Sequence, residues 1–390
     1  MAERRAEIAA LGRIRRVVVK IGSSVLANES GLAASELSRL AGEIGALKES
    51  GLSVTVVSSG AIAAGRTVLG GGRPRTIPQR QAAASVGQIR LMAEWDRAFS
   101  AQGITVAQIL LDAEDLASRH RYLNAEHAIS ALHRGGVLPI VNENDTVAVD
   151  ELKFGDNDNL SALVATLVGA DLLVLLSDVP GLFESDPRID PEAALISALH
   201  RIDNKVLAHA GDGSNPLGTG GMRSKLLAAK KAAHAGIASV IADGREAGTL
   251  ARVLDPGQNE GTLILPSADP VARRKHWIAF SMKPRGSLQC DEGATTAVRR
   301  RGRSLLPSGV TAVEGKFRRG DCISLVDAAG DEFARGLAVY GAEEASLIAG
   351  KRSQQVGGIL GYELGAELVH RNDLVLLDGD APVDPKKKKR

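Results

Sequence analysis

Six short aliphatic runs, separated by helix-like stretches, constrain the fold of this 390-residue chain more than any other feature. The runs cover residues 16–20, 53–57, 103–110, 137–141, 172–176 and 237–242. Near-continuous apolar strands that alternate with helices are typical of a parallel sheet with both faces covered. We therefore predict an α/β fold whose mostly parallel sheet is sandwiched between helices.

Composition agrees with this fold class and excludes several others. Hydrophobic residues make up 44% of the chain and aromatic residues only 3%, with 43 glycines for tight loops. A formal net charge of +2 does not fit a polycation that coats nucleic acid or membranes. Two cysteines, Cys290 and Cys322, do not make a disulfide framework. The sequence shows neither a membrane span nor a secretory signal, so we predict a cytoplasmic protein.

The strand and helix alternation ends near residue 265. We expect a first domain over residues 1–266 and a smaller β-rich domain over residues 275–378. Its β-like runs include residues 304–310 and 322–326. Residues 379–390 form a charged tail, which we interpret as solvated, with nucleic-acid contact as the alternative.

Two polar clusters flank one short connection in the first domain. Residues 142–145 follow the strand-like run 137–141, and residues 155–159 open the helix-like segment 160–168. Short polar side chains beyond strand ends hold small polar ligands in open α/β sheets. Asn and Asp are also common in turns and helix caps, and Asn159 could be such a cap. The two clusters together favour a binding site.

Two lysines stand where a phosphate group could be held. The sequence lacks both the Walker pattern and the dinucleotide-binding glycine pattern. Lys20 ends the first strand beside Gly22, and a glycine-rich loop at 218–221 comes just before Lys225. Two such cations could neutralise the charge that develops during phosphoryl transfer. A solvated lysine and a flexible loop are the plainer alternatives.

Other polar residues could complete this site. Asp158 could hold both lysines through charge-assisted hydrogen bonds. Asp178 follows the run 172–176, where it could line a nucleotide pocket or cap a turn. Ser59 and Gly60 open a helix whose free N–H groups could bind an acidic substrate. The same two residues are also common in plain strand-to-helix junctions.

These residues resemble the amino acid kinase family. The matching segments are 19–24, 57–65, 141–145, 153–161 and 218–225. They occur in the family's order across roughly residues 15–265, so the resemblance implies an amino acid kinase catalytic domain at 1–266. Segments 291–296, 304–307 and 359–362 look like a PUA domain.

The resemblance also implies an activity. The reaction would be ATP-dependent phosphorylation of the side-chain carboxylate of L-glutamate to glutamyl 5-phosphate, the first step of proline biosynthesis. Mg²⁺ would ride on the ATP phosphates, and we expect no separate protein metal site. Feedback inhibition by proline and a homo-oligomer are further implications of the family.

Residue roles follow from the matched motifs. Lys20 and Lys225 would stabilise the transferring phosphoryl group, with Asp158 organising them. The positions that match glutamate binding are Ser59, Gly60, Asp145 and Asn157, and Asp145 could pair with the α-amino group. The positions that match ATP binding are Lys20, Ser177, Asp178, Thr219, Gly220, Gly221, Met222, Arg223, Ser224 and Lys225. Ser224 stands where a threonine is common, and Arg223 adds a cation without an assigned role.

Two other functions are compatible with part of the sequence. The PUA-like domain and the cluster 142–145 weigh against a family member acting on acetylglutamate or aspartate. For acetylglutamate, Asp145 would also be misplaced opposite an acetylated amine. An RNA-binding protein is suggested by residues 273–319, which hold 12 Lys and Arg against 3 Asp and Glu. A basic surface that serves oligomer contacts or solubility would look the same, so RNA binding is left open as an additional activity.

Overall fold

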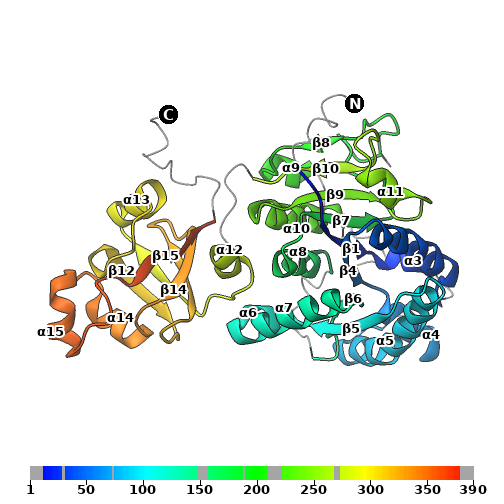
Figure 1. Ribbon diagram of the computed structural model, residues 1–390. Helices are drawn as coiled ribbons and strands as arrows, with labels where there is room; N and C mark the ends of the chain where they lie inside the picture. Colours follow the sequence, from blue (N-terminus) through cyan, green and yellow to red (C-terminus); the bar gives the residue numbers. More distant parts are fainter. Residues whose placement is uncertain are drawn as a thin grey trace. The chain divides into compact units, whose positions relative to one another are not determined.

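The computed structural model describes residues 12–28, 31–72, 74–147, 157–187, 189–209, 221–267 and 273–377. The chain divides into two compact units, residues 1–270 and 271–390. The first is an α/β unit and the second is rich in β-structure (Figure 1). The predicted fold class is confirmed.

The first unit is built on an eight-stranded sheet of order β5-β6-β4-β1-β7-β9-β10-β8. Its strands are β1 (Arg16–Ile21), β4 (Ser53–Ser58), β5 (Val106–Leu111), β6 (Leu138–Glu143), β7 (Leu172–Ser177), β8 (Ala198–Leu199), β9 (Ala238–Asp243) and β10 (Thr262–Ile264). Neighbouring strands are parallel except for the antiparallel pair β9 and β10. A separate short ladder joins β2 (Ala27–Asn28) to β3 (Gly31–Leu32). The six predicted runs all contain strands, but β5 begins at Val106 because Gly103 forms a turn with φ of 69°.

Helices lie on both faces of this sheet (Figure 1). They are α2 (Ser23–Leu26), α3 (Ala34–Glu49), α4 (Ala61–Val68), α5 (Ile77–Ser100), α6 (Ala113–Ala117), α7 (Arg119–Arg134), α8 (Asn157–Val168), α9 (Asn204–His209), α10 (Met222–His234) and α11 (Thr249–Leu254). Helices α3, α5 and α11 cover one face, and α7, α8 and α10 cover the other (Figure 1). The central strand β1 is therefore buried on both sides, with Val17, Val18 and Val19 at most 1% exposed. Its functional residues can only project from its end.

Two glycines bring α4 and α5 into backbone contact. A Cβ atom at Gly65 would lie 1.7 Å from the carbonyl oxygen of Ala83, and one at Gly87 would lie 1.8 Å from that of Ala61. Any larger residue would force the helices apart. This close approach determines where the side chains of α5 reach the sheet.

The second unit has a five-stranded sheet of order β12-β11-β13-β14-β15. Its strands are β11 (Gly286–Cys290), β12 (Val310–Gly315), β13 (Cys322–Val326), β14 (Glu332–Ala338) and β15 (Val369–Leu376). Its helices are α12 (Arg273–Phe280), α13 (Glu292–Arg301), α14 (Ala342–Ile348), α15 (Val356–Leu360) and the 3₁₀ turns η2 (Pro307–Gly309) and η3 (Ser353–Gln355). The middle of the predicted β-like run 304–310 is the turn η2, because Pro307 starts a helical turn readily and cannot donate to a strand ladder. On either side of it, Leu305 makes a β-bridge to Val369 and Val310 begins β12.

Both cysteines belong to the second unit and are free, buried thiols. Burial raises the pKa of each thiol to about 12, so both are protonated and unreactive near neutral pH. In the part of the chain that the structure describes, no helix is both long and apolar enough to span a membrane.

Candidate active site

Two buried lysines share one buried aspartate at the carboxyl edge of the sheet. Lys20 lies at the end of β1, while Asp158 and Lys225 lie in the first turns of α8 and α10. The Lys20 Nζ atom is 2.6 Å from Asp158 Oδ1, and the Lys225 Nζ atom is 3.5 Å from Asp158 Oδ2. The three side chains are 4%, 6% and 0% exposed, in the order Lys20, Lys225 and Asp158. The predicted role of Asp158 as a bridge between the lysines matches this geometry.

This Lys–Asp–Lys centre carries a net charge of +1 in a place with little access to water. Buried charges are costly unless they are paired, and one carboxylate cannot fully balance two ammonium groups. The Ser224 hydroxyl group also donates a hydrogen bond to the carboxylate, at 2.7 Å from Asp158 Oδ2. The N-termini of α8 and α10 add partial positive charge at the same point. The centre therefore suits an anion with several oxygens, such as a phosphoryl group.

Amide and hydroxyl groups gather beside this centre. The Nδ2 atom of Asn157 lies 2.8 Å from Ser59 Oγ and 3.0 Å from Asn142 Oδ1. The Asn142 Nδ2 atom in turn donates to Gln88 Oε1 at 2.8 Å. Ser58 at the end of β4 is held by Trp95, whose indole N–H donates to Ser58 Oγ at 2.9 Å. These contacts bring β4, β6, α5 and α8 together around one polar corner.

Gly60 and Asp145 lie at the same edge of the sheet. Gly60 caps α4 with φ of 111°, a left-handed conformation that favours glycine. Asp145 is half-buried in the turn after β6. The next residue, Thr146, ties this turn to α5 through a hydroxyl contact of 2.9 Å with Ser85. Both predicted residues thus border the polar corner.

Ser177 and Asp178 form the other side of the edge, at the end of β7. The Ser177 hydroxyl group donates to Asp178 Oδ1 at 3.2 Å. The backbone here is supported by the loop after β9: Gly244 N–H donates to the Ser177 carbonyl at 2.8 Å, and Arg245 Nη2 donates to that of Asp178 at 2.6 Å. Although burial of Asp243 opposes its ionisation, the hydrogen bonds and charge of Arg245 hold its pKa below the usual value.

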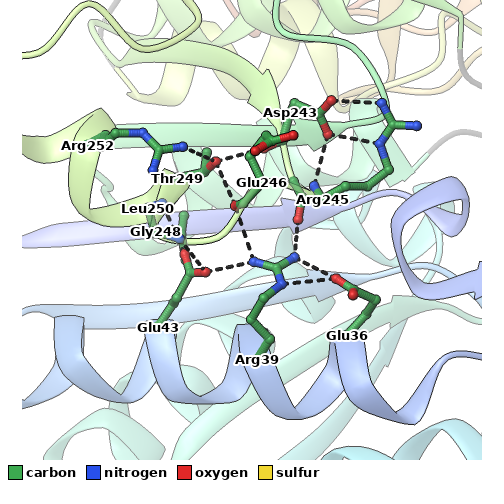
Figure 2. A network of polar contacts seen from close by, with 11 residues as sticks. Glu36, Arg39, Glu43, Asp243, Arg245, Glu246, Gly248, Thr249, Leu250 and Arg252 are labelled. Carbon is green, nitrogen blue, oxygen red and sulfur yellow. Dashed lines mark hydrogen bonds and ion pairs between the residues drawn. The ribbon is translucent and has the colours of Figure 1, made fainter.

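A network that begins on α3 anchors the loop after β9, as Figure 2 shows. The Arg39 guanidinium binds Glu36 and Glu43 at 2.8 and 2.7 Å. It also donates to the carbonyl groups of Gly244 and Glu246. The Glu43 carboxylate accepts backbone N–H groups at the start of α11, including that of Gly248 at 2.9 Å. Helix α3 therefore supports the end of β7 indirectly, through this loop.

The remaining predicted residues are those around the start of α10 and Asn159 of α8. Gly221 is the N-cap of α10 and Met222 its first residue, while Thr219 and Gly220 lie outside the described residues. Arg223 is exposed and donates to the Leu207 carbonyl of α9 at 3.4 Å. Asn159 is not a cap, because α8 begins at Asn157; it accepts a hydrogen bond from Lys231 of α10.

Sequence reasoning missed several residues that shape the site. Gln88, Arg39 and Arg245 were not identified, and Asn142 was noted only as part of its cluster. The neighbouring Gly87 was a usable signal for Gln88, because a glycine inside a helix often marks close packing. Arg39 and Arg245 have charged partners nearby in the chain, but their contacts with the loop after β9 and with Asp178 join residues far apart in sequence, so no local signal points to them.

Comparison with known proteins shows the family of this chain. The profile of the amino acid kinase family matches residues 15–243, which is more than half of the chain. This chain belongs to the amino acid kinase family. The profile of the PUA domain matches residues 286–360 in the second unit.

Relatives match almost the whole chain. Glutamate 5-kinase from Citrifermentans bemidjiense is 50% identical over 369 residues, covering 94% of this chain and 99% of the relative. Glutamate 5-kinase from Geobacter sulfurreducens is 48% identical over 369 residues, with the same coverage. Among solved structures, UMP kinase from Bacillus anthracis covers 65% of this chain and 97% of its own, at 18% identity and a TM-score of 0.46.

Proposed function

We propose that this chain transfers the γ-phosphoryl group of ATP to the side-chain carboxylate of L-glutamate, forming glutamyl 5-phosphate, the first step of proline biosynthesis. The observation that carries the proposal is the pair of buried lysines that share Asp158. The glutamate 5-kinase relatives, which match over nearly their full length, support the choice of substrate.

Lys20 and Lys225 act on the phosphoryl group in this proposal. Their ammonium groups contact the oxygens of the γ-phosphate, where charge is spread as the bond to ADP breaks. Asp158 keeps the two cations at a fixed separation. The remaining ATP contacts come from Ser177, Asp178 and the residues 219–225, whose backbone N–H groups suit phosphate oxygens.

Ser59, Gly60, Asn157 and Asp145 hold the glutamate, with Asp145 paired to its α-ammonium group. A free glutamate side chain has a pKa near 4.3, so its carboxylate is already ionised at neutral pH. One carboxylate oxygen attacks the γ-phosphorus, a new O–P bond forms, and the bond to the ADP oxygen breaks. The nucleophile has no proton to lose, so the reaction needs no general base. Positioning and charge neutralisation supply the catalysis.

Mg²⁺ enters this proposal bound to the ATP phosphates. In the described part of the chain, no group of three or more His, Cys, Asp or Glu residues could hold a metal ion. The Asp158 carboxylate is engaged by two lysines and Ser224. An ion that keeps several waters and binds mainly phosphate oxygens fits such a site, and it would supply further neutralisation of the phosphates.

A direct test is ATP consumption with L-glutamate, N-acetyl-L-glutamate or L-aspartate, with hydroxylamine present to trap an acyl phosphate. Hydroxamate formed with glutamate alone is the expected result. Lys225→Ala should remove most turnover, whereas Lys230→Ala, on the same helix, serves as the matched control. Hydroxamate formed with another acid, or near-normal turnover in Lys225→Ala, would contradict the proposal.

Finer properties implied by the family are also part of the proposal. We propose that L-proline acts as a feedback inhibitor and that the protein is a cytoplasmic homo-oligomer. Titration of the hydroxamate assay with L-proline tests the first. Sedimentation of the purified chain tests the oligomeric state.

RNA binding by the second unit is a second candidate activity. A cavity of about 1240 Å³ there is lined by four cationic residues, Arg285, Lys316, Arg318 and Arg319, together with Asp321, Glu343 and Glu344. We propose that this surface binds the phosphate backbone of RNA. Binding of RNA by the full chain should then weaken steeply with salt and be lost in Arg318→Glu/Arg319→Glu. RNA binding that is unaffected by this double substitution would rule out the cavity as the RNA-binding surface.

A further inference from the structure

A row of side-chain amides leads from α5 to the glutamate side of the site. We infer that Gln88, acting through Asn142, orients the side-chain amide of Asn157 so that the site selects a substrate with a free α-ammonium group. This inference rests on the proposed function, because Asn157 is assigned there to glutamate binding. Gln88 is a positioning residue: it acts through other residues rather than on the substrate.

The orientation of Asn157 follows from its surroundings. One end of its amide lies 3.3 Å from the carbonyl oxygen of Ser58, which can only accept a hydrogen bond. That end must therefore be the Nδ2 atom. The same nitrogen lies 3.0 Å from Asn142, so Asn142 must present its Oδ1 atom there.

Gln88 supports the same orientation of Asn142 from its other end. With Oδ1 facing Asn157, the Nδ2 atom of Asn142 faces α5 and donates to Gln88 Oε1 at 2.8 Å. Asn142 is only 2% exposed, so water has little access to replace this acceptor. Gln88 Nε2 donates in turn to Gln108 Oε1 at 3.3 Å. The amide donors of Asn142 and Gln88 therefore both point away from Asn157 Oδ1.

The result is a buried acceptor beside the catalytic centre. Asn157 Oδ1 is buried and makes no hydrogen bond to any of the described residues. A buried carbonyl oxygen without a partner is costly, so the site gains from a ligand that donates to it. An ammonium group offers three donors and a positive charge. A substrate with a hydroxyl or hydrogen in its place offers a weaker donor or none.

The backbone contact between α4 and α5 makes Gln88 a rigid anchor for this row. Gly87, the residue before it, lies directly against Ala61 of α4. Because any shift of α5 would break that contact, the backbone of Gln88 is held in place at this end of the row.

The test compares Gln88→Met with Gln88→Glu in the full-length enzyme. Methionine keeps the length of the side chain but cannot accept the Asn142 hydrogen bond, whereas the glutamate carboxylate still can. The measurements are kcat/KM for L-glutamate and for 2-hydroxyglutarate, and KM for ATP. We expect Gln88→Met to lower kcat/KM for glutamate by about tenfold and that for 2-hydroxyglutarate little, so their ratio falls by about tenfold.

KM for ATP should not change in Gln88→Met, and Gln88→Glu should keep the wild-type ratio. Gln81→Met, the same substitution seven residues earlier on α5, is the matched control and should behave as wild type. If Gln88→Met does not fold, the near-isosteric Asn142→Leu breaks the next link and should lower the same ratio.

Different failures have different meanings. If the wild-type enzyme phosphorylates glutamate and its selectivity survives both Gln88→Met and Asn142→Leu, the inference is wrong and the proposed function stands. An equal loss for both substrates, or a loss in Gln88→Glu as large as in Gln88→Met, would also overturn the inference. A folded wild-type enzyme that is inactive on glutamate would instead reject the proposed function.

Discussion

At the scale of single residues, Asp158 is the group on which most of the site depends. It is fully buried, and its two oxygens contact Lys20, Lys225 and Ser224. Removing one partner from a buried charged network is strongly destabilising, because the remaining charges lose their compensation. The same residue thus holds the lysines at a productive separation and makes their burial tolerable.

We predict that Asp158→Asn lowers kcat by about 10²- to 10³-fold, the loss typical of a missing preorganised electrostatic contact. An amide cannot balance two ammonium groups, and its NH₂ group would face one of them. The measurement is kcat at saturating ATP and glutamate, with Asp96→Asn on the exposed face of α5 as control. A folded Asp158→Asn enzyme with near-normal kcat would contradict this view of the centre.

His133 makes the stability of the first unit depend on pH. Its Nε2 atom lies 3.0 Å from Thr55 Oγ1. Burial, followed by the charges of Arg16 and Lys48, lowers its pKa below the usual value. The unfolded chain therefore takes up a proton more readily, so stability should fall as the pH drops below about 6.5.

We predict that His133→Gln, which can still hydrogen-bond to Thr55, reduces this loss of stability. The loss of stability can be measured from urea unfolding midpoints of the wild type and the variant, at a series of pH values from neutrality to below the usual histidine pKa. His234 is shifted in the same direction, so part of the dependence should remain. An unchanged pH profile in His133→Gln would show that His133 is not responsible.

At the scale of elements, the site depends on how closely helices approach one another. Gly65 and Gly87 let α4 and α5 touch through their backbones, which brings Gln88 to Asn142. On the other side, Arg39 and Glu43 of α3 hold the loop between β9 and α11. Both contacts support the site from outside it.

Two glycine substitutions should have opposite effects on stability. Gly65→Ala should cost about 1–3 kcal/mol or more, because its Cβ would lie 1.7 Å from a backbone oxygen. Gly42→Ala in α3 meets nothing within 4 Å and should stabilise by about 0.5–1 kcal/mol. Chemical denaturation of both variants measures the difference. A Gly65→Ala variant as stable as Gly42→Ala would show that α4 and α5 can separate at little cost.

At the scale of the whole molecule, the chain consists of two units with separate hydrophobic cores. One core in the first unit includes Val17 and Val19 of β1 with Trp95 and Phe99, whereas that of the second unit includes Leu288 and Phe333. Two cooperative unfolding transitions are therefore expected, because two-state behaviour belongs to single domains.

Phe333→Ala should affect only one of these transitions. Phe333 is fully buried, and the Arg299 guanidinium lies 4.8 Å from the centre of its ring. Its truncation should cost about 3–5 kcal/mol in the second unit. Calorimetry should then show one transition at a lower temperature and one unchanged, with kinase activity intact below the first. A shift of both transitions would mean that the two cores unfold together.

Much of the fold was readable from the sequence, and so were the principal charged residues of the site. Strands β1 and β7 are unbroken aliphatic runs, and Lys20 stands at the end of the first run. Both the strands and the place of Lys20 could therefore be predicted from a few neighbouring residues. The β-like run 304–310 was predicted only in part: Leu305 and Val310 make β-contacts, but Pro307 directs the residues between them into the turn η2. The contacts among Gln88, Asn142 and Asn157 were not readable at all.

The α/β class, the strands of the main sheet and the residue types of the candidate site are properties of neighbouring residues, so they could be predicted from the amino-acid sequence. Which of those residues meet depends on the folded chain. Gln88 and Asn142 are 54 residues apart in the chain, and Arg39 and Gly244 are 205 apart. Their contacts depend on which strands are neighbours and how closely helices pack against them, and no local pattern of residues encodes either.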